Sequence, residues 1–423
     1  MPRHLFFFLP IGVCSTALAL AFLPLALLSL ALLSLVAQPG SARAQAADLP
    51  DSNGREQIEN LCTGCHSLRN ITRSLGYTRD EWRELIGTMV DLSEDRMLRA
   101  EITTYLAAHF QPSGNRAAKL VPGDLSIGFE EWQVPTLGQR ARDPIEAPDG
   151  AIWWAGQWGN LIGRIDPATG DMKEYPLPDG SYPHSVTLDA AGKVWYTGNK
   201  NGTVGYLDPK TEQITVYPMP HPAARDPHTA IFDAAGILWF TLQQSNMIGR
   251  LDPASGDIRL VTPPTAGSRP YGIKIDRDGT PWVACNGSNC LLKVDPETMA
   301  IAEIELPTPG TTVNSGMGKL GRYDPASGAV KEWDSPSGPD SHPYAIAVVD
   351  GIVWYNESGV RPDPLVRFDP KTETFQSWAI PSGNIYAGIV RHMRATRDGN
   401  LLIHQTATNR IIRVDLTGAA PTQ

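Results

Sequence analysis

The sequence predicts a small all-α domain followed by an all-β propeller of seven blades, one of them truncated, with an N-terminal strand closing the ring. Three observations lead to this fold class. A motif of the form Ile-Gly-Arg-Leu-Asp-Pro recurs over the C-terminal two thirds of the chain. Short helical patterns are confined to residues 50–112. The 423 residues include 39 glycines and 36 prolines, a content that favours a turn-rich β fold over a helical bundle.

The chain is mildly acidic. It carries 36 Lys and Arg against 45 Asp and Glu, a formal net charge of −9. A nucleic-acid-binding protein needs a basic face, and docking on anionic lipid needs a polybasic patch. Neither kind of partner is therefore expected.

The N-terminus predicts export. Arg3 and His4 precede an apolar run over residues 5–36, and Ala42-Arg43-Ala44 fits the small-x-small site of signal peptidase. The run is also long enough to span a bilayer. Residues 1–44 are thus either a cleaved signal peptide or an uncleaved anchor, and a membrane partner is expected only in the second case. Both place the rest of the chain in the periplasm or outside the cell.

The pentapeptide Cys62-Thr63-Gly64-Cys65-His66 carries the clearest chemistry. Two thiols one helical turn apart can reach the two vinyl groups of a porphyrin, and the next imidazole then lies under the iron. This is the attachment pattern of c-type haem. A zinc site would need a second paired motif, which the sequence lacks. We expect haem c held by thioethers of Cys62 and Cys65, with His66 as an axial iron ligand.

Helical patterns surround this motif. Thr78 and Glu81 have the spacing of a capping box at the start of one helix. With its CxxCH motif, the segment 50–112 resembles a small class I cytochrome c domain. Residues 113–128, rich in turn formers and without apolar periodicity, are expected to be a linker.

The resemblance implies a methionine as sixth iron ligand, which raises the reduction potential and suits electron transfer. Met89, 23 residues after His66, lies where the family usually has it. Met97, His109 or an open position are the alternatives. Filling the core is the other role open to each methionine.

The repeat ends in an aspartate that marks each unit. These aspartates are Asp166, Asp208, Asp252, Asp295, Asp324, Asp369 and Asp415. The intervals between them are 42, 44, 43, 29, 45 and 46 residues. Seven units of this length indicate a propeller with four strands in each blade, over residues 129–418.

Two irregularities refine the prediction. The last unit has no outer strand, whereas an orphan outer strand stands at 130–135, before the first unit. That strand should complete the last blade and hide the open edges. The 29-residue interval lacks about 14 residues, so the fifth blade should be reduced.

The inner strands open with polar residues when the units are aligned on their repeat tryptophans. These are Arg142, His184, His228, Tyr271, Tyr344 and Arg391. Their convergence near the axis would make a ligand site at the propeller mouth. A wet, polar channel without a ligand is the alternative.

The propeller units resemble the virginiamycin B lyase (streptogramin lyase) family, through Pro183-His184, Trp239-Phe240-Thr241 and Ile248-Gly249-Arg250. Members open cyclic streptogramin B depsipeptides by elimination with a magnesium ion. The resemblance implies a histidine as general base and, 14 residues later, a glutamate that holds the metal.

The family pair is not reproduced within any unit. Fourteen residues after His184 and His228 stand Gly198 and Leu242. The acidic residue at the corresponding strand end is Glu357, in a blade that opens with a tyrosine. Under the lyase hypothesis, His184 or His228 would act with Glu357 from another blade, and magnesium would be a cofactor only in that case.

Cys285 and Cys290 flank a hairpin turn, and in an exported protein they are expected to form a disulfide; two unpaired thiols are the alternative. A lactonase-type metal hydrolase would need several Asp, Glu or Asn side chains near the axis, and the ring is too cationic for that.

The function expected from these patterns is that of an exported c-type cytochrome that transfers electrons. Its propeller would bind a redox partner protein or a small substrate at its mouth. The alternative is a magnesium-dependent carbon–oxygen lyase with an accessory haem domain. As an enzyme, the chain would be such a lyase or a haem-linked oxidoreductase.

Overall fold

The computed structural model describes residues 49–64, 67–74, 76–113, 116–309, 317–384 and 389–417. All of them belong to one compact unit, Ala47–Gln423. The expected signal peptide or anchor, residues 1–44, lies outside the described part. None of the helices in the described residues is long and apolar enough to cross a membrane.

The described part of the N-terminal region is helical. Its helices are α1 (Arg55–Cys62), α2 (Arg69–Thr72), α3 (Arg79–Gly87) and α4 (Arg96–His109). The capping box that opens α3 is confirmed, since Thr78 and Glu81 satisfy each other's backbone N–H groups. The short helix α2 was not predicted. Apolar faces of the helices meet in one core, which includes Ile58, Trp82, Leu85, Ile102 and Leu106.

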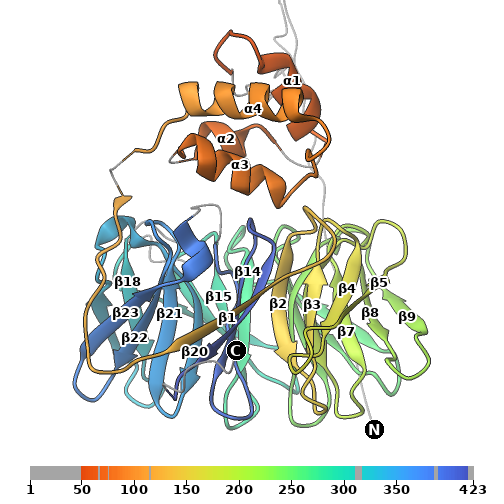
Figure 1. Ribbon diagram of the computed structural model, residues 1–423. Helices are drawn as coiled ribbons and strands as arrows, with labels where there is room; N and C mark the ends of the chain where they lie inside the picture. Colours follow the sequence, from red (N-terminus) through yellow and green to blue (C-terminus); the bar gives the residue numbers. More distant parts are fainter. Residues whose placement is uncertain are drawn as a thin grey trace, which may run out of the picture. The chain divides into compact units, whose positions relative to one another are not determined.

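The rest of the chain is a β-propeller (Figure 1). Each of its first four blades has four consecutive strands. The first two blades are β2 (Ala141–Glu146), β3 (Ile152–Gly156), β4 (Leu161–Ile165) and β5 (Met172–Pro176), and then β6 (Pro183–Leu188), β7 (Val194–Gly198), β8 (Thr203–Leu207) and β9 (Ile214–Pro218). The next two are β10 (Pro227–Phe232), β11 (Leu238–Leu242), β12 (Met247–Leu251) and β13 (Ile258–Val261), and then β14 (Pro270–Ile275), β15 (Pro281–Cys285), β16 (Cys290–Val294) and β17 (Ile301–Glu305). The remaining strands are β18 (Lys319–Tyr323) and β19 (Val330–Asp334); β20 (Pro343–Val349), β21 (Ile352–Glu357), β22 (Pro364–Asp369) and β23 (Thr374–Ala379); and β24 (Arg394–Ala395), β25 (Leu401–Gln405), β26 (Arg410–Asp415) and β1 (Gly128–Gln133). Short 3₁₀ helices precede β20 (Pro339–Ser341) and follow β23 (Pro381–Asn384).

The number of full blades differs from the prediction. The described residues form six four-stranded blades rather than seven, and the fifth unit contributes only the two-stranded sheet β18–β19. Its 29-residue interval leaves too little chain for two inner strands. Ile346 and Val348 on the neighbouring strand β20 are consequently 43% and 59% exposed.

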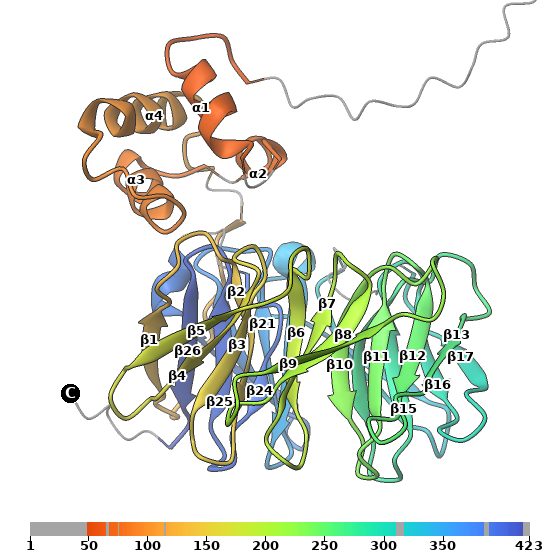
Figure 2. The same cartoon turned by 90° about the vertical axis from the view of Figure 1, so that its right-hand side faces the viewer.

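The predicted closing strand is confirmed. β1 pairs antiparallel with β26, from Gly128 opposite Asp415 to Gln133 opposite Arg410 (Figure 2). The last blade therefore takes its outer strand from the N-terminal side of the propeller and its other three strands from the C-terminus. This pairing hides both edges and joins the two ends of the repeat array.

The segment expected to be a linker, 113–128, makes ordered contacts in its described part. Ala118 N–H donates to the Arg361 carbonyl, and Val121 exchanges hydrogen bonds with Ser377. Leu125 and Ile127 pack against the core cluster beneath the blade β20–β23. The chain is thus held along this blade on its way to β1.

The repeat motif has a packing reason. In its third strand, Gly163 and Gly249 lie against the rings of Trp154 and Phe240, aromatic residues of the second strand. A Cβ atom at either glycine would lie 2.0–2.2 Å from a ring carbon. Glycine leaves room for the ring, so the Ile-Gly-Arg pattern and the tryptophan-aromatic pattern recur together.

The turn between the first two strands is fixed by a repeated hydrogen-bond pattern. In three blades an aspartate accepts the indole Nε1–H of the repeat tryptophan at 2.8–2.9 Å: Asp189 with Trp195, Asp233 with Trp239, and Asp276 with Trp282. The same carboxylates accept turn N–H groups, as Asp233 does from Ala235 and Ile237. One side chain therefore satisfies the turn and the buried indole.

Replacing Asp233 by alanine should destabilise the propeller by about 2 kcal/mol, because it leaves the indole N–H of fully buried Trp239 and two turn N–H groups without an acceptor. Urea denaturation followed by tryptophan fluorescence measures the loss. Asp257→Ala, which removes a half-exposed carboxylate paired with Arg259, is the matched control and should change stability little. Equal midpoints for the two variants would contradict the assigned role.

Candidate functional site

A large cavity lies beside the motif cysteine. Its volume is about 660 Å³. From the helical region its lining residues are Cys62, Ser67, Arg69, Asn70, Ile71, Arg73, Tyr77, Trp82, Leu85, Ile86, Met89 and Leu106. From the propeller they are Gly138, Arg140, Trp158, Ile389, Arg391, Thr406, Ala407 and Asn409. Both regions belong to the same compact unit.

The structure describes two of the four predicted haem residues, Cys62 and Met89. Cys62 ends α1 and lines the cavity. Cys65 and His66 lie outside the described residues. Met89, which follows α3 closely, lines the same cavity and packs against the helical core.

The two alternatives to Met89 lie elsewhere. Met97 is 85% exposed in the first turn of α4. His109, at the end of that helix, lies 2.7 Å from the Ser52 hydroxyl through Nε2, with its ring against Tyr105. Neither is among the lining residues of the cavity. Of the three, only Met89 shares a cavity wall with Cys62.

Contacts between α3 and two propeller loops fix the position of Met89. The Thr88 hydroxyl donates to the Ala407 carbonyl at 2.8 Å, and its own carbonyl accepts from Gly138 N–H at 3.0 Å. A Cβ atom on Gly138 would lie 3.0 Å from the Met89 carbonyl, in a backbone conformation with φ of +67°. Glycine is therefore needed where this loop approaches Met89.

The charges around the cavity are of one sign. Arg69, Arg73, Arg140 and Arg391 line it, and none of its lining residues is an aspartate or glutamate. Ile71, Leu85, Ile86 and Leu106 supply an apolar part of the wall. In a chain of net charge −9, such a wall fits a largely apolar molecule that carries negative groups.

The polar residues that open the inner strands do converge. The rings of His184 and His228 stack with centroids 3.4 Å apart, and Tyr271 lies 4.3 Å from His228. The hydroxyls of Tyr271 and Tyr344 are hydrogen bonded to each other, and Arg391 Nη1 donates to the Tyr344 hydroxyl at 3.3 Å. The alignment of the repeats thus predicted which residues share one level of the axis.

Threonines of the second strands hold this ring in place. Thr197 accepts the N–H of Ser185, next to His184, and donates to the carbonyl of His228 in the next blade at 2.8 Å. Thr241 repeats the pattern one blade later and donates to the Tyr271 carbonyl at 2.7 Å. Each Trp-aromatic-Thr strand therefore ties one ring residue to the next.

Sequence reasoning missed a buried ion pair beside the ring. Asp143, at a left-handed φ of +52°, lies 3.2 Å from His392 Nδ1 and 3.5 Å from Arg142 Nε. Burial tends to raise the pKa of Asp143, but the attraction of His392 and Arg142 outweighs it and the pKa falls well below its ordinary value. The Arg142-Asp143 pair in an inner strand was the available signal, because a charged pair is unusual there.

The histidines around the ring are neutral near pH 7. Burial, reinforced by the charge of Arg142, lowers the pKa of His184 and of His228 well below the ordinary value. Burial also lowers the pKa of His392 to about 4 despite its contact with Asp143, and lowers that of His404. Neutral imidazoles can accept protons, but they add no positive charge to the ring.

Glu357 does not join the histidines. Its carboxylate is fully buried and accepts hydrogen bonds from the Ser335 hydroxyl, the Ser337 N–H and the Ser337 hydroxyl. These serines follow β19, so the side chain serves the contact between β21 and the two-stranded sheet. Among the described residues, no hydrogen bond or ion pair joins Glu357 to His184 or His228, so the expected pairing is not supported.

The donor set does not fit a magnesium ion. Magnesium prefers carboxylate, carbonyl and water oxygens, whereas the ring offers imidazoles, phenols and guanidiniums. No group of three or more His, Cys, Asp or Glu side chains in the described part of the chain could hold a metal ion.

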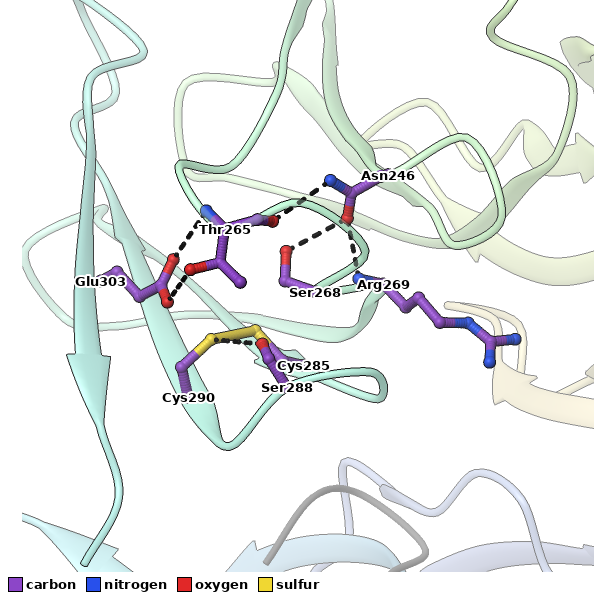
Figure 3. Close-up of a disulfide and its surroundings, with 8 residues drawn as sticks. All are labelled: Asn246, Thr265, Ser268, Arg269, Cys285, Ser288, Cys290 and Glu303. Carbon is purple, nitrogen blue, oxygen red and sulfur yellow. Dashed lines mark hydrogen bonds between the residues drawn. A yellow bond between two sulfur atoms is a disulfide. The ribbon is translucent and has the colours of Figure 1, made fainter. Parts of the chain in front are cut away.

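Cys285 and Cys290 are joined by a disulfide across the hairpin between β15 and β16 (Figure 3). Cys285 pairs with Pro270, the residue before Tyr271. The loop that leads to Tyr271 is also held by Asn246, which accepts from Ser268 and from the N–H of Arg269. The disulfide thus lies beside the start of the strand that carries Tyr271, one of the ring residues.

Stability should fall steeply on acidification between pH 6.5 and 4. The unfolded chain protonates His184, His228, His392 and His404 near pH 6.5, whereas burial in the folded chain lowers the pKa of His392 to about 4 and the pKa of each of the other three well below its ordinary value. Asp363 opposes this trend, because burial raises its pKa to about 7 and only the folded state keeps its proton in this range. The histidines outnumber Asp363, so unfolding takes up protons in this range, and each proton taken up is worth about 1.4 kcal/mol per pH unit.

Urea midpoints measured from pH 4.5 to 7.5 test this expectation. His228→Asn should reduce the slope by about one proton, and His221→Asn, at an exposed position, should leave it unchanged. A wild-type profile that is flat below pH 6.5 would show that the ring histidines are already charged in the folded state.

Comparison with known proteins identifies the propeller type. The model of the virginiamycin B lyase family matches residues 112–315. A streptogramin B lyase structure is similar at 24% identity and a TM-score of 0.61, over 69% of this chain and 98% of that chain. The virginiamycin B lyase of Staphylococcus aureus is similar at 23% identity and a TM-score of 0.61, over 69% and 100%. Comparison with curated proteins finds no match.

These similarities establish a virginiamycin B lyase-like propeller. At identities below 25% they concern the fold and leave the reaction open. A catalytically inactive variant of the Staphylococcus aureus lyase, with quinupristin, is similar at 24% identity and a TM-score of 0.59, over 68% of this chain and 99% of that chain. The helical region before residue 112 is not covered by the family match.

Proposed function

We propose that the chain is an exported c-type cytochrome: residues 1–44 direct it to the periplasm, residues 50–112 bind haem c and transfer electrons, and the propeller binds a redox partner or a small substrate. One observation carries the proposal. The cysteine that opens the CxxCH motif and the methionine expected as sixth ligand line one cavity of about 660 Å³. They are 27 positions apart in the sequence, so local spacing alone does not account for the shared wall.

The residues of the cavity fit a haem. A porphyrin is a flat apolar ring with two carboxylates, and the helical side of the cavity combines an apolar wall with two arginines, Arg69 and Arg73, and no acidic side chain. Cys62 and Cys65 would hold the haem through thioethers, with His66 and Met89 on the iron. When bound, the haem supplies a one-electron redox centre.

The chain's own residues prepare this environment. Trp82 donates its indole N–H to the Phe110 carbonyl at 3.1 Å, and Tyr77 packs edge-on against its ring. Leu85 and Leu106 are 4% and 1% exposed. These packed side chains exclude water from one side of the cavity. A dry wall favours the less charged state of a bound redox group and supports a raised potential.

Met89→Ala should convert the low-spin spectrum of the protein, expressed with haem-maturation machinery, into one with an open or water-bound sixth position, and should lower the reduction potential. Spectroelectrochemistry measures both changes. Met97→Ala is the matched control at an exposed site and should change neither.

Two outcomes would contradict the proposal. One is a wild-type protein that retains no haem on a denaturing gel. The other is a Met89→Ala protein whose spectrum equals that of wild type, which would exclude Met89 as a ligand. A Cys62→Ser, Cys65→Ser double variant should lose covalent haem, whereas Cys285→Ser, Cys290→Ser should retain it.

A second candidate, elimination from a streptogramin B substrate, rests on the stacked, neutral pair His184 and His228 in a virginiamycin B lyase-like propeller. A neutral imidazole can act as general base. The ring nevertheless lacks a carboxylate partner for a metal, since the serines after β19 hold Glu357.

The purified, haem-loaded protein should therefore open no streptogramin B ring in the presence of magnesium, as followed by chromatography with a chelated control. Magnesium-dependent opening that disappears in a His184→Ala, His228→Ala double variant would establish the lyase instead. Opening that survives this double variant would exclude both histidines as its base.

A further inference from the structure

Two arginines of the propeller stand in the cavity wall without an acidic partner. Arg140 lies directly before β2, and Arg391 shortly before β24. No ion pair involves either side chain within the described residues. Arg391 Nε is buried without a hydrogen-bond partner, and Arg391 Nη1 donates to the Tyr344 hydroxyl at 3.3 Å. Burial tends to lower the pKa of Arg391, but the neighbouring phenols of Tyr344 and Tyr271 raise it. Both guanidiniums therefore keep donors available to the cavity.

The surroundings reinforce the positive charge. The charged side chains that act on one another here are Arg140, Arg142, Arg391, Arg394, Lys274 and Asp143. The one carboxylate among them, Asp143, already faces Arg142 and His392. Burial, with repulsion from Arg391 and Arg142, lowers the pKa of Arg140 well below its ordinary value. The ring histidines are neutral, so they do not change this excess of positive charge.

Aromatic rings hold both guanidiniums in place. The Arg140 guanidinium lies 4.8 Å from the Trp158 ring centre, and that of Arg391 lies 5.7 Å from the Tyr344 ring. Stacking of this kind orients the planar fork and leaves its edge free. A fixed guanidinium edge matches the two oxygens of a carboxylate or phosphate. Both arginines are partly buried, and a bound anion would offset the cost of holding two cations there.

We propose that Arg140 and Arg391 form a binding site for a small oxyanion, either the carboxylate of an organic molecule or inorganic phosphate. The hydroxyl pair of Tyr271 and Tyr344, hydrogen bonded to each other beside Arg391, closes the site on the ring side. The binding itself needs no haem. A role for the anion as electron donor or as modulator of the haem rests on the proposed function.

The test is isothermal titration of the full chain with sodium succinate and, separately, with sodium phosphate, at constant ionic strength set by sodium chloride. One of the two should bind saturably. Arg140→Gln and Arg391→Gln should each weaken that binding at least tenfold, and Arg391→Lys should weaken it less. Arg259→Gln, in an exposed pair with Asp257, is the matched control and should bind as wild type does.

The outcomes separate this site from the haem proposal. Binding of succinate alone identifies an organic carboxylate site, and binding of phosphate alone a phosphate site. Absence of saturable binding for both, or equal affinity in a folded Arg140→Gln, Arg391→Gln double variant, overturns the inference. Because the titration is equally possible on protein that carries no haem, loss of the haem would overturn only the proposed function. A melting curve of each variant confirms that it is folded.

Discussion

The antiparallel pairing of β1 with β26 is the constraint on which the candidate site depends. It holds the last blade beside the first, and the charged residues come from both sides of this seam: Arg140, Arg142 and Asp143 at the start of β2, and Arg391 just before β24. Like charges at such distances repel one another, so an open ring would let them separate. The six backbone pairs of β1 with β26 resist that repulsion.

The electrostatics of the ring differ from those that a metal-assisted elimination needs. A general base beside a metal-bound carboxylate requires both groups on the substrate side. Here the histidines are neutral and stacked, while Glu357 is held by serines at the contact with the two-stranded sheet. The charge on the ring side is mainly that of guanidiniums, and the carboxylate of Asp143 already faces Arg142 and His392. The mouth of this virginiamycin B lyase-like propeller is therefore cationic, and its fold alone does not determine a reaction.

The repeats made most of the propeller predictable, because each blade repeats the same packing problem. The glycine beside the second-strand aromatic residue, the aspartate that accepts from the tryptophan, and the threonine that links ring residues all recur at fixed spacing. The same spacing predicted which side chains meet at the axis. The one short interval in the same spacing also predicted that the fifth unit is reduced. The spacing could not predict that Asp143 contacts His392 across the seam, since this contact depends on non-repeating neighbours. The short helix α2 and the contacts of the linker segment escaped prediction for the same reason.

The two candidate sites share one short loop. Gly138 approaches the Met89 carbonyl and donates its N–H to Thr88, and two residues later the same loop places Arg140 in the cavity wall. On the other side, Ala407 accepts from the Thr88 hydroxyl, and Thr406 accompanies Arg391 in the wall. A displacement of either arginine by a ligand would therefore be transmitted, through two hydrogen bonds, to the end of α3 that carries Met89. If Met89 is an iron ligand, as proposed, these two hydrogen bonds are the contacts through which a ligand at the propeller mouth would act on the haem, and any such coupling acts equally in both directions.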